Sequence, residues 1–399
     1  MKTKVSIVKG TKDPQEGQIK EMVAEAIDHI GGLDDIIGKG DRVLIKPNIA
    51  YTLKPGESEL TDPRVSKAIY DLLAERGASP FIAESSASGV NGEEAFQASG
   101  YYDLRDQGYE VINLKKKGMS KVISIDNPKA KVLKKVKIFE MAKEADAIIN
   151  VPVIKTHDHL PATLALKNMK GLMPDSEKKK FHSKYGLSEA IADLNLAVKS
   201  QLVIVDGILC REGLGYPWSE EIEMDLIVAG KDPVAVDTVV LQIMGINPQE
   251  QTHAILAQEL GIGTMDMDMI DVVGEQIDHV KTSFKRPAEA LQSMLSLHDF
   301  KLLSDEKTCT GCRGAMYYFL KSTDAQGKLD QLKELTFVLG KHETAPRELS
   351  ELNKEETILV GVCTEQYKDL GRHVVGCPPL GSDIAAVALQ GQAKQPYED

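Results

Sequence analysis

Short apolar runs rich in β-branched residues alternate with amphipathic stretches along the first 275 residues or so. Val5–Val8, Val43–Ile45 and Pro80–Ala83 have the composition of buried strands. Gln15–Ile30 and Pro63–Arg76 carry apolar residues at helical spacing. This alternation of strands and helices predicts an α/β fold with a doubly wound, mainly parallel sheet.

The same pattern continues through the middle of the chain. The segment Ala147–Ile154 is apolar almost throughout, which indicates one strand buried on both faces. Leu187–Val198 has helical spacing. Further strands are expected at Glu110–Asn113, Val136–Phe139, Leu202–Val205, Leu226–Ala229 and Ile270–Val273.

The character of the chain changes after about Gly274. Residues 280–300 have the pattern of a linker and a helix, and a smaller α/β unit is expected after them. Its predicted helices are 314–321 and 382–389, and its predicted strands are 335–339 and 358–362. Because 399 residues exceed the size at which a single core usually stops growing, we predict two domains, residues 1–280 and 295–399.

Composition and charge argue against some classes of function. Hydrophobic residues make up 42% and charged residues 27%, as in ordinary globular proteins, and the net charge is −12. An acidic balance argues against nucleic acid as a bulk partner. The chain has no run of 18 apolar residues and no secretory signal pattern at its start, so we expect no membrane span and a cytoplasmic location. The sequence does not indicate an oligomeric state.

Four cysteines fall within the predicted C-terminal unit. They are Cys309, Cys312, Cys363 and Cys377. The C-x-x-C spacing of the first two lets both sulfurs reach one metal centre, and four thiolates suit a 4Fe-4S cluster or a tetrahedral zinc site. Because the four cysteines are dispersed along a predicted α/β unit, we favour the iron–sulfur cluster over zinc. The alternatives are zinc, a redox dithiol on the C-x-x-C pair and unmetallated cysteines. The fifth cysteine, Cys210, is expected to be a core residue.

The sequence VVGCPP around Cys377 resembles the last cluster cysteine in the small subunits of complex I and of nickel–iron hydrogenases. This resemblance implies an iron–sulfur context, and we expect a role in redox chemistry and anaerobic metabolism.

Polar clusters follow several of the predicted strands of the large unit. Ligands of open parallel sheets bind beyond the carboxyl ends of the strands, so these clusters are expected to form one site. Lysines there would supply positive charge and the other side chains neutral hydrogen bonds, which suits a small molecule bearing a carboxylate or phosphate. The candidate binding residues are Lys46, Asn48, Ser85, Ser86, Thr156, Lys167 and Asn168, and the candidate catalytic residues are Lys155, His157 and His182.

The same clusters carry a resemblance to a known family. The segments IKPN, TDP, IAESS, NVPVIKTH, TLALKNMKG, VDGI and KDPVAVD occur in this order within roughly residues 4–275. Together they resemble the domain of unknown function 362 family, whose members are often fused to ferredoxin-like iron–sulfur segments. The resemblance implies the α/β fold and a redox context, but no settled reaction. The compact ferredoxin motif is missing here, and the predicted cysteine unit stands in its place.

Some polar residues have simpler interpretations. The run Lys178–Lys180 is expected to be a solvated loop, or else a mobile flap over the site. His159 and His253 are expected to be surface or helix histidines rather than ligands. Asp237 is expected to face either the crevice or solvent.

Three functions remain open from sequence. The leading one is a redox or cluster-dependent enzyme that binds an anionic small molecule, with a histidine as acid–base. The second is a non-catalytic electron carrier or maturation factor that docks a partner protein. The third is a lyase or racemase-type enzyme with a purely structural metal.

Overall fold

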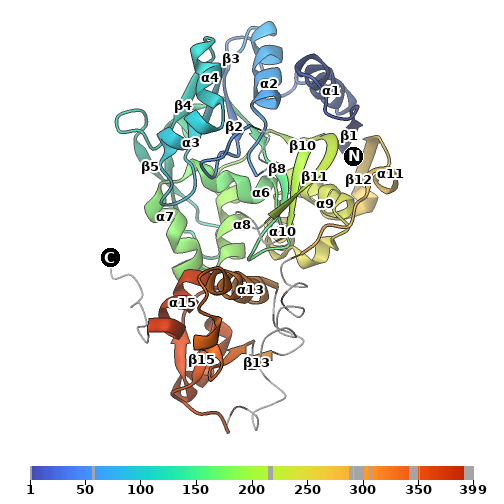
Figure 1. Cartoon of the computed structure of the whole chain (residues 1–399). Coiled ribbons are helices and arrows are strands. Elements are labelled where there is room, and N and C mark those ends of the chain that lie inside the picture. The colour runs from blue at the N-terminus through green and yellow to red at the C-terminus, as the bar shows by residue number, and fades with distance from the viewer. Residues whose placement is uncertain are drawn as a thin grey trace.

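The computed structural model describes residues 2–55, 59–213, 219–286, 291, 301–304, 308, 310–340, 349 and 351–390, and only the backbone of residues 182, 183, 310 and 390. Two separate main sheets organise these residues (Figure 1).

The large sheet runs in the order β12-β1-β11-β10-β7-β2-β3-β4. The pairs β10–β7, β7–β2, β2–β3, β3–β4 and β1–β12 are parallel, whereas β11 is antiparallel to both of its neighbours. The prediction of a mainly parallel α/β sheet is therefore confirmed. The strands are β1 (Thr3–Lys9), β2 (Arg42–Pro47), β3 (Ser79–Glu84), β4 (Val111–Asn113), β7 (Ala147–Val151), β10 (Leu202–Gly213), β11 (Ser219–Gly230) and β12 (Ile270–Gly274).

Helices cover both faces of this sheet. Alternate residues of β2 show why: Val43 and Ile45 pack into a core with α1 and α2, while Leu44 packs on the opposite face with α8. Such alternation within one strand is what a doubly wound sheet requires. The helices of this unit are α1 (Glu16–His29), α2 (Pro63–Glu75), α3 (Gly92–Ala98), α4 (Tyr101–Asp106), α5 (Met141–Glu144), α6 (Ala165–Asn168), α7 (Asp175–Lys180), α8 (Leu187–Ala197), α9 (Pro233–Ile243), α10 (Thr252–Glu259) and α11 (Ile277–Val280).

Two predicted strands of the large sheet behave differently from expectation. The apolar run Ala147–Ile154 is split into β7 and β8 (Val153–Thr156), because Pro152 between them has no N–H to continue the ladder. β8 then pairs with β10 and with the short strand β9 (Ala162–Thr163). The predicted strand 136–139 lies in β6 (Lys135–Phe139), which forms a separate hairpin with β5 (Val122–Asp126).

The smaller sheet is entirely parallel and runs in the order β13-β14-β15-β16. The rings of Phe319 and Phe337, 5.6 Å apart, join a helix to this sheet at the centre of the second core. Its elements are β13 (Lys301–Ser304), β14 (Thr336–Leu339), β15 (Thr357–Val360), β16 (Arg372–Val374), α13 (Thr310–Ala325) and α15 (Gly381–Gln390). The second, smaller α/β unit is thus confirmed, while the exact domain bounds, 1–280 and 295–399, stay a prediction.

Helices α13 and α15 lie between the small sheet and the large unit (Figure 1). Backbone contacts join the two units directly: the amide of Leu187, at the start of α8, donates to the carbonyl of Cys377 at 3.2 Å. Within the part of the chain that is described, no helix is both long enough and apolar enough to cross a membrane.

Candidate active site

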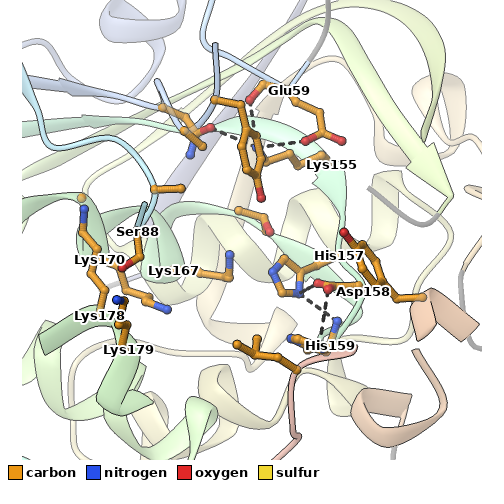
Figure 2. Close-up of a pocket in the computed structure, with 18 of the residues that line it drawn as sticks. Glu59, Ser88, Lys155, His157, Asp158, His159, Lys167, Lys170, Lys178 and Lys179 are labelled. Atoms are coloured by element: carbon orange, nitrogen blue, oxygen red, sulfur yellow. Dashed lines mark hydrogen bonds and ion pairs between the residues drawn. The ribbon is translucent and has the colours of Figure 1, made fainter. Parts of the chain in front are cut away.

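A cavity of about 720 Å³ lies where the carboxyl edge of the large sheet meets the C-terminal unit (Figure 2). Strands β2, β3 and β8 end at this edge, as the sequence predicted. The C-terminal unit contributes Tyr318, Val375, Leu380 and Asp383. Of the predicted site residues, the cavity wall includes Asn48, Ser86, Lys155, Thr156, His157, Lys167 and Asn168.

Lys46 lies beneath this wall rather than in it. Its side chain is fully buried, and its ammonium donates to the carboxylate of Glu84, to the carbonyl of Pro47 at 2.6 Å and to Asn168 Oδ1 at 3.3 Å. Burial lowers the pKa of Lys46, and Glu84 opposes that shift. Because its donors are occupied, Lys46 holds the ends of β2 and β3 together and does not reach the cavity. This differs from the expectation that it binds the ligand.

Asn48 and Lys155 form a second buried link. Asn48 donates to Asn168 Oδ1 at 2.9 Å and accepts from Lys155 Nζ at 3.0 Å. Lys155 also donates to the carbonyl of Glu59 at 2.9 Å, and its ammonium lies 4.0 Å from the Glu59 carboxylate. Lys155 therefore lines the cavity with its ammonium already bonded, which favours a structural role over a catalytic one. Thr156 is likewise engaged, since its hydroxyl donates to the carbonyl of Gly213 at 2.7 Å.

Lys178 is buried, contrary to the interpretation of its lysine run as a solvated loop. It lies in α7, and its ammonium donates to the carbonyls of Ser85 and Ser86, the latter at 2.7 Å, and to Ser85 Oγ at 2.7 Å. Burial lowers the pKa of Lys178 to about 7. The contact closes the turn after β3 over the cavity. Ser85 faces this contact and does not line the cavity.

Lys167 is the lysine best placed to meet a ligand. It lines the cavity, and among the residues that the structure describes its ammonium has no hydrogen-bond or ion-pair partner. Burial, and then the charge of Lys155, lower the pKa of Lys167 to about 8, so it is still mainly protonated at neutral pH. A half-buried ammonium without a partner is costly, and an anion in the cavity would remove that cost.

The turn after β8 carries His157, Asp158 and His159, which lie together on one side of the cavity (Figure 2). His157 Nδ1 is 3.0 Å from Asp158 Oδ1 and accepts from the backbone amide of His159 at 2.9 Å. His159 Nε2 is 3.4 Å from Asp158 Oδ2. Burial, and then Lys167, lower the pKa of His157 to about 3, so its imidazole is neutral at pH 7. Burial alone would raise the pKa of Asp158, but His159, His157 and Lys167 lower it below its ordinary value.

These three residues also have the donor set of a metal site. One ligand atom from each lies within 4.8 Å of the others. Two imidazoles and a carboxylate suit zinc or ferrous iron. Nearby lysines oppose a bare cation here, because Lys167 and Lys170 add positive charge to the same cavity. The electrostatics therefore favour an anion over a metal ion as the first ligand.

The helix that carries Cys312, α13, packs against this turn. A methyl group on Gly314 of α13 would be 1.5 Å from the carbonyl oxygen of Asp158, and one on Gly311 would be 2.8 Å from that of His159. The first turn of α13, which carries Cys312, is therefore in backbone contact with the His157–His159 turn. Cys309 lies outside the described residues, so its position relative to the other three cysteines is not tested.

The three described cysteines come from segments that converge. A methyl group on Gly361 would be 3.1 Å from Cys312 Sγ and 3.5 Å from the carbonyl oxygen of Gly376. Gly361 precedes Cys363 by two residues, and Gly376 precedes Cys377 directly. This glycine-lined cradle and its thiol donors fit a cluster or a zinc ion, which remain alternatives. Cys210 is fully buried in the core of the large unit, as expected.

Three further residues were assigned from the sequence: His182, Asp237 and His253. The side chain of His182 lies outside the described residues, so its catalytic role stays untested. Asp237 faces neither crevice nor solvent: it is fully buried and accepts from the amides of Ala165 and Leu166 at 2.8 and 3.1 Å. His253 is a helix histidine, one of the two expected alternatives: it lies in α10 and is fully buried.

Sequence reasoning missed Glu59, Asp158, His159 and Asp383 as cavity residues. Glu59 follows a polar loop and has no flanking apolar pattern that would place it. Asp158 and His159 directly follow the recognised Lys155–His157 segment, so their position after a buried strand was the available signal. Asp383 belongs to the other unit, and only the packing of the two units brings it here.

Comparison with known proteins covers mainly the large unit. A family model described as Domain of unknown function (DUF362) matches residues 43–242. That range includes the lysines and histidines of the cavity and none of the four C-terminal cysteines.

Two individual proteins are also similar to parts of this chain. Thylakoid-associated protein sll1697 of Synechocystis sp. is 26% identical over 278 residues, which are 68% of this chain and 84% of that protein. The structure of the lactate racemase apoprotein from Thermoanaerobacterium thermosaccharolyticum is similar with 16% identity and a TM-score of 0.33, over 52% of this chain. The match spans 50% of the racemase chain.

Proposed function

The chain belongs to the family described as Domain of unknown function (DUF362), and from its site we propose that it is an enzyme acting on a small anionic molecule held in the cavity. One observation carries the proposal: the ammonium of Lys167, which has no partner among the described residues, and the imidazole of His157 line the same cavity at the carboxyl edge of the sheet. Lys167 would bind the negative charge, and His157 would move a proton.

The surroundings of His157 suit proton transfer without an imidazolium. When Nδ1 carries the proton it donates to Asp158, and Nε2 has a free lone pair that acts as a base. When Nδ1 is bare it accepts from the amide of His159, and Nε2 carries a proton that acts as an acid. For the ring to stay neutral as Nε2 takes up a proton, the Nδ1 proton would pass to the Asp158 carboxylate, and it would return to Nδ1 when Nε2 gives up its proton.

We further propose that Cys309, Cys312, Cys363 and Cys377 hold a 4Fe-4S cluster beside this cavity. Support comes from the convergence of the described cysteine segments and from the backbone contact of α13, which carries Cys312, with the His157–His159 turn. When bound, such a cluster would accept or donate single electrons. Residues that follow Cys377, among them Pro379 and Leu380, line the cavity and would separate the cluster from solvent there.

Metal analysis of anaerobically purified protein tests the cluster. We expect about four iron and four sulfide per chain, with broad visible absorption that bleaches with dithionite. Replacing Cys363 and Cys377 together by serine should abolish it. Colourless protein carrying one zinc per chain would favour the structural-metal alternative instead.

A turnover screen tests the enzyme. The protein is incubated in D₂O with a defined mixture of organic acids and phosphate esters, with and without benzyl viologen, and the products are followed by mass spectrometry. We expect the wild type to change or deuterate at least one compound, and His157→Asn to leave that compound unchanged. If no compound is changed and none binds, the enzyme proposal fails.

One observation favours a second candidate, an electron carrier that docks a partner protein. Val362, Val375 and Leu380 are exposed apolar residues close in sequence to Cys363 or Cys377. Apolar surface next to a redox site suits a transient protein interface. A cluster that exchanges electrons with a carrier protein, in a chain that neither binds nor changes any small anion, would favour this candidate.

A further inference from the structure

Two polar groups of residues lie at opposite sides of the cavity (Figure 2). The lysine end comprises Ser86, Ser88, Lys170, Lys178 and Lys179, and the histidine end comprises His157, Asp158 and His159. Lys167 lies between the two ends (Figure 2). Resting on the proposed function, we infer that the ligand is a phosphorylated molecule whose phosphate binds at the lysine end, away from the reacting part at the histidine end.

Ser86 lines the cavity at the lysine end, and its buried hydroxyl has no partner among the described residues. Its side chain is 1% exposed, and within the described residues Ser86 Oγ has no hydrogen-bond partner. A buried hydroxyl left unpaired costs about 1–3 kcal/mol. The protein meanwhile fixes the backbone around it, because Lys178 donates to the carbonyls of Ser85 and Ser86. Lys178 therefore fixes the backbone of this turn, and no described residue hydrogen-bonds to the Ser86 hydroxyl.

Lys170 supplies unneutralised charge at the same end. Its ammonium lies 4.8 Å from the centre of the Phe181 ring, and it has no ion pair with any residue that the structure describes. The acids near Lys178 at this end are paired with other lysines: Glu84 pairs with Lys46, and Asp175 pairs with Lys115 at 2.9 Å. Burial, and then Lys167 and Lys178, lower the pKa of Lys170, and an anion bound beside it would raise that pKa.

A phosphate meets these groups better than a carboxylate does. It offers three terminal oxygens and up to two negative charges, so it can accept from the Ser86 hydroxyl and from the Lys170 ammonium at once. The cavity volume of about 720 Å³ is that of sites for molecules much larger than a simple organic acid. A remote phosphate would also supply binding energy that positions the reacting group at His157.

Calorimetric titration with inorganic phosphate and with acetate tests the inference on the full-length protein. The variants are Lys170→Met, Ser86→Ala and Lys167→Met, and circular dichroism confirms that each is folded. We expect Lys170→Met to weaken phosphate binding about tenfold or more, Ser86→Ala to weaken it several-fold, and Lys167→Met to change it by less than about threefold. A methionine at position 170 keeps an apolar chain over Phe181, so the fold should survive.

Phosphonoacetate, 3-phosphonopropionate and 6-phosphonohexanoate then test whether one molecule spans both ends. At least one should bind about tenfold more tightly than inorganic phosphate, and Lys167→Met should remove that gain. Equal loss of phosphate affinity in Lys167→Met and Lys170→Met, or no gain with any phosphonocarboxylate, would overturn the inference. Acetate binding that depends on Lys167 without phosphate binding would leave the proposed function standing and end this inference alone. Failure of every probe would end both.

Discussion

Gly314→Ala is expected to separate α13 from the His157–His159 turn. The added methyl would lie 1.5 Å from the carbonyl oxygen of Asp158, where ordinary contact begins at 3.4 Å. The helix and the turn must therefore move apart by about 2 Å, the difference between these two distances. Both are backbone, so no side-chain rotation relieves the clash.

Gly314→Ala should lower the free energy of unfolding because it overpacks the contact between α13 and the turn. Inserting a methyl into a well-packed contact costs about 1–3 kcal/mol, and the short distance places this case at or above the upper end. For units of this size each kcal/mol lowers the Tm by about 2–4 °C. A shift of about 1 Å at His157 would also weaken chemistry at the site by roughly a hundredfold.

Gly17→Ala is the matched control. Gly17 lies in the first turn of α1, and a methyl there would have no neighbour within 4 Å. Both substitutions change glycine to alanine in a helix, so the gain in helix propensity cancels in the comparison. Differential scanning calorimetry and acetate titration are applied to both. A Gly314→Ala protein as stable as the Gly17→Ala protein, with equal acetate affinity, would refute the contact between the two units.

Three further predictions concern the charged groups of the cavity. Lys155→Met should lower the free energy of unfolding by about 3–5 kcal/mol, because the buried Glu59 would lose its ammonium partner. Urea unfolding measures this loss, and the control Lys129→Met should unfold within about 0.5 kcal/mol of wild type. Anion affinity should be constant below pH 7 and fall above pH 8 as Lys167 loses its proton, and a titration across pH 6–10 that stays flat would disagree. Because the pKa of His157 is about 3 in the fold and near 6.5 when unfolded, stability should decline as pH falls from 6.5 towards 3, and less steeply in His157→Gln.

The fold was largely predictable because apolar patterning decides it. β2 and β7 are buried on both faces and read as continuous apolar runs, which is the mark of a central parallel strand. The break at Pro152 was not foreseen, although a proline inside an apolar run gives the signal. The antiparallel pairing of β11 could not be read from its composition, because the same apolar residues suit either direction.

The site was predictable only in outline. Strand ends identified Asn48, Ser86 and His157, since parallel strands bring their carboxyl ends to one edge. Which lysines face the cavity was not predictable, because that depends on where the buried carboxylates lie. Glu84 takes Lys46 out of the site, and nothing local in sequence shows that Lys167 has no hydrogen-bond or ion-pair partner among the described residues.

The central claim is that the cavity binds an anion through Lys167. Saturation-transfer NMR with acetate at pH 7 measures it directly in wild type, Lys167→Met and Lys129→Met. One charge-assisted contact is worth about 1.5–3 kcal/mol, so Lys167→Met should bind acetate about ten- to a hundredfold more weakly while Lys129→Met matches wild type. Equal acetate affinity in all three proteins would contradict the account.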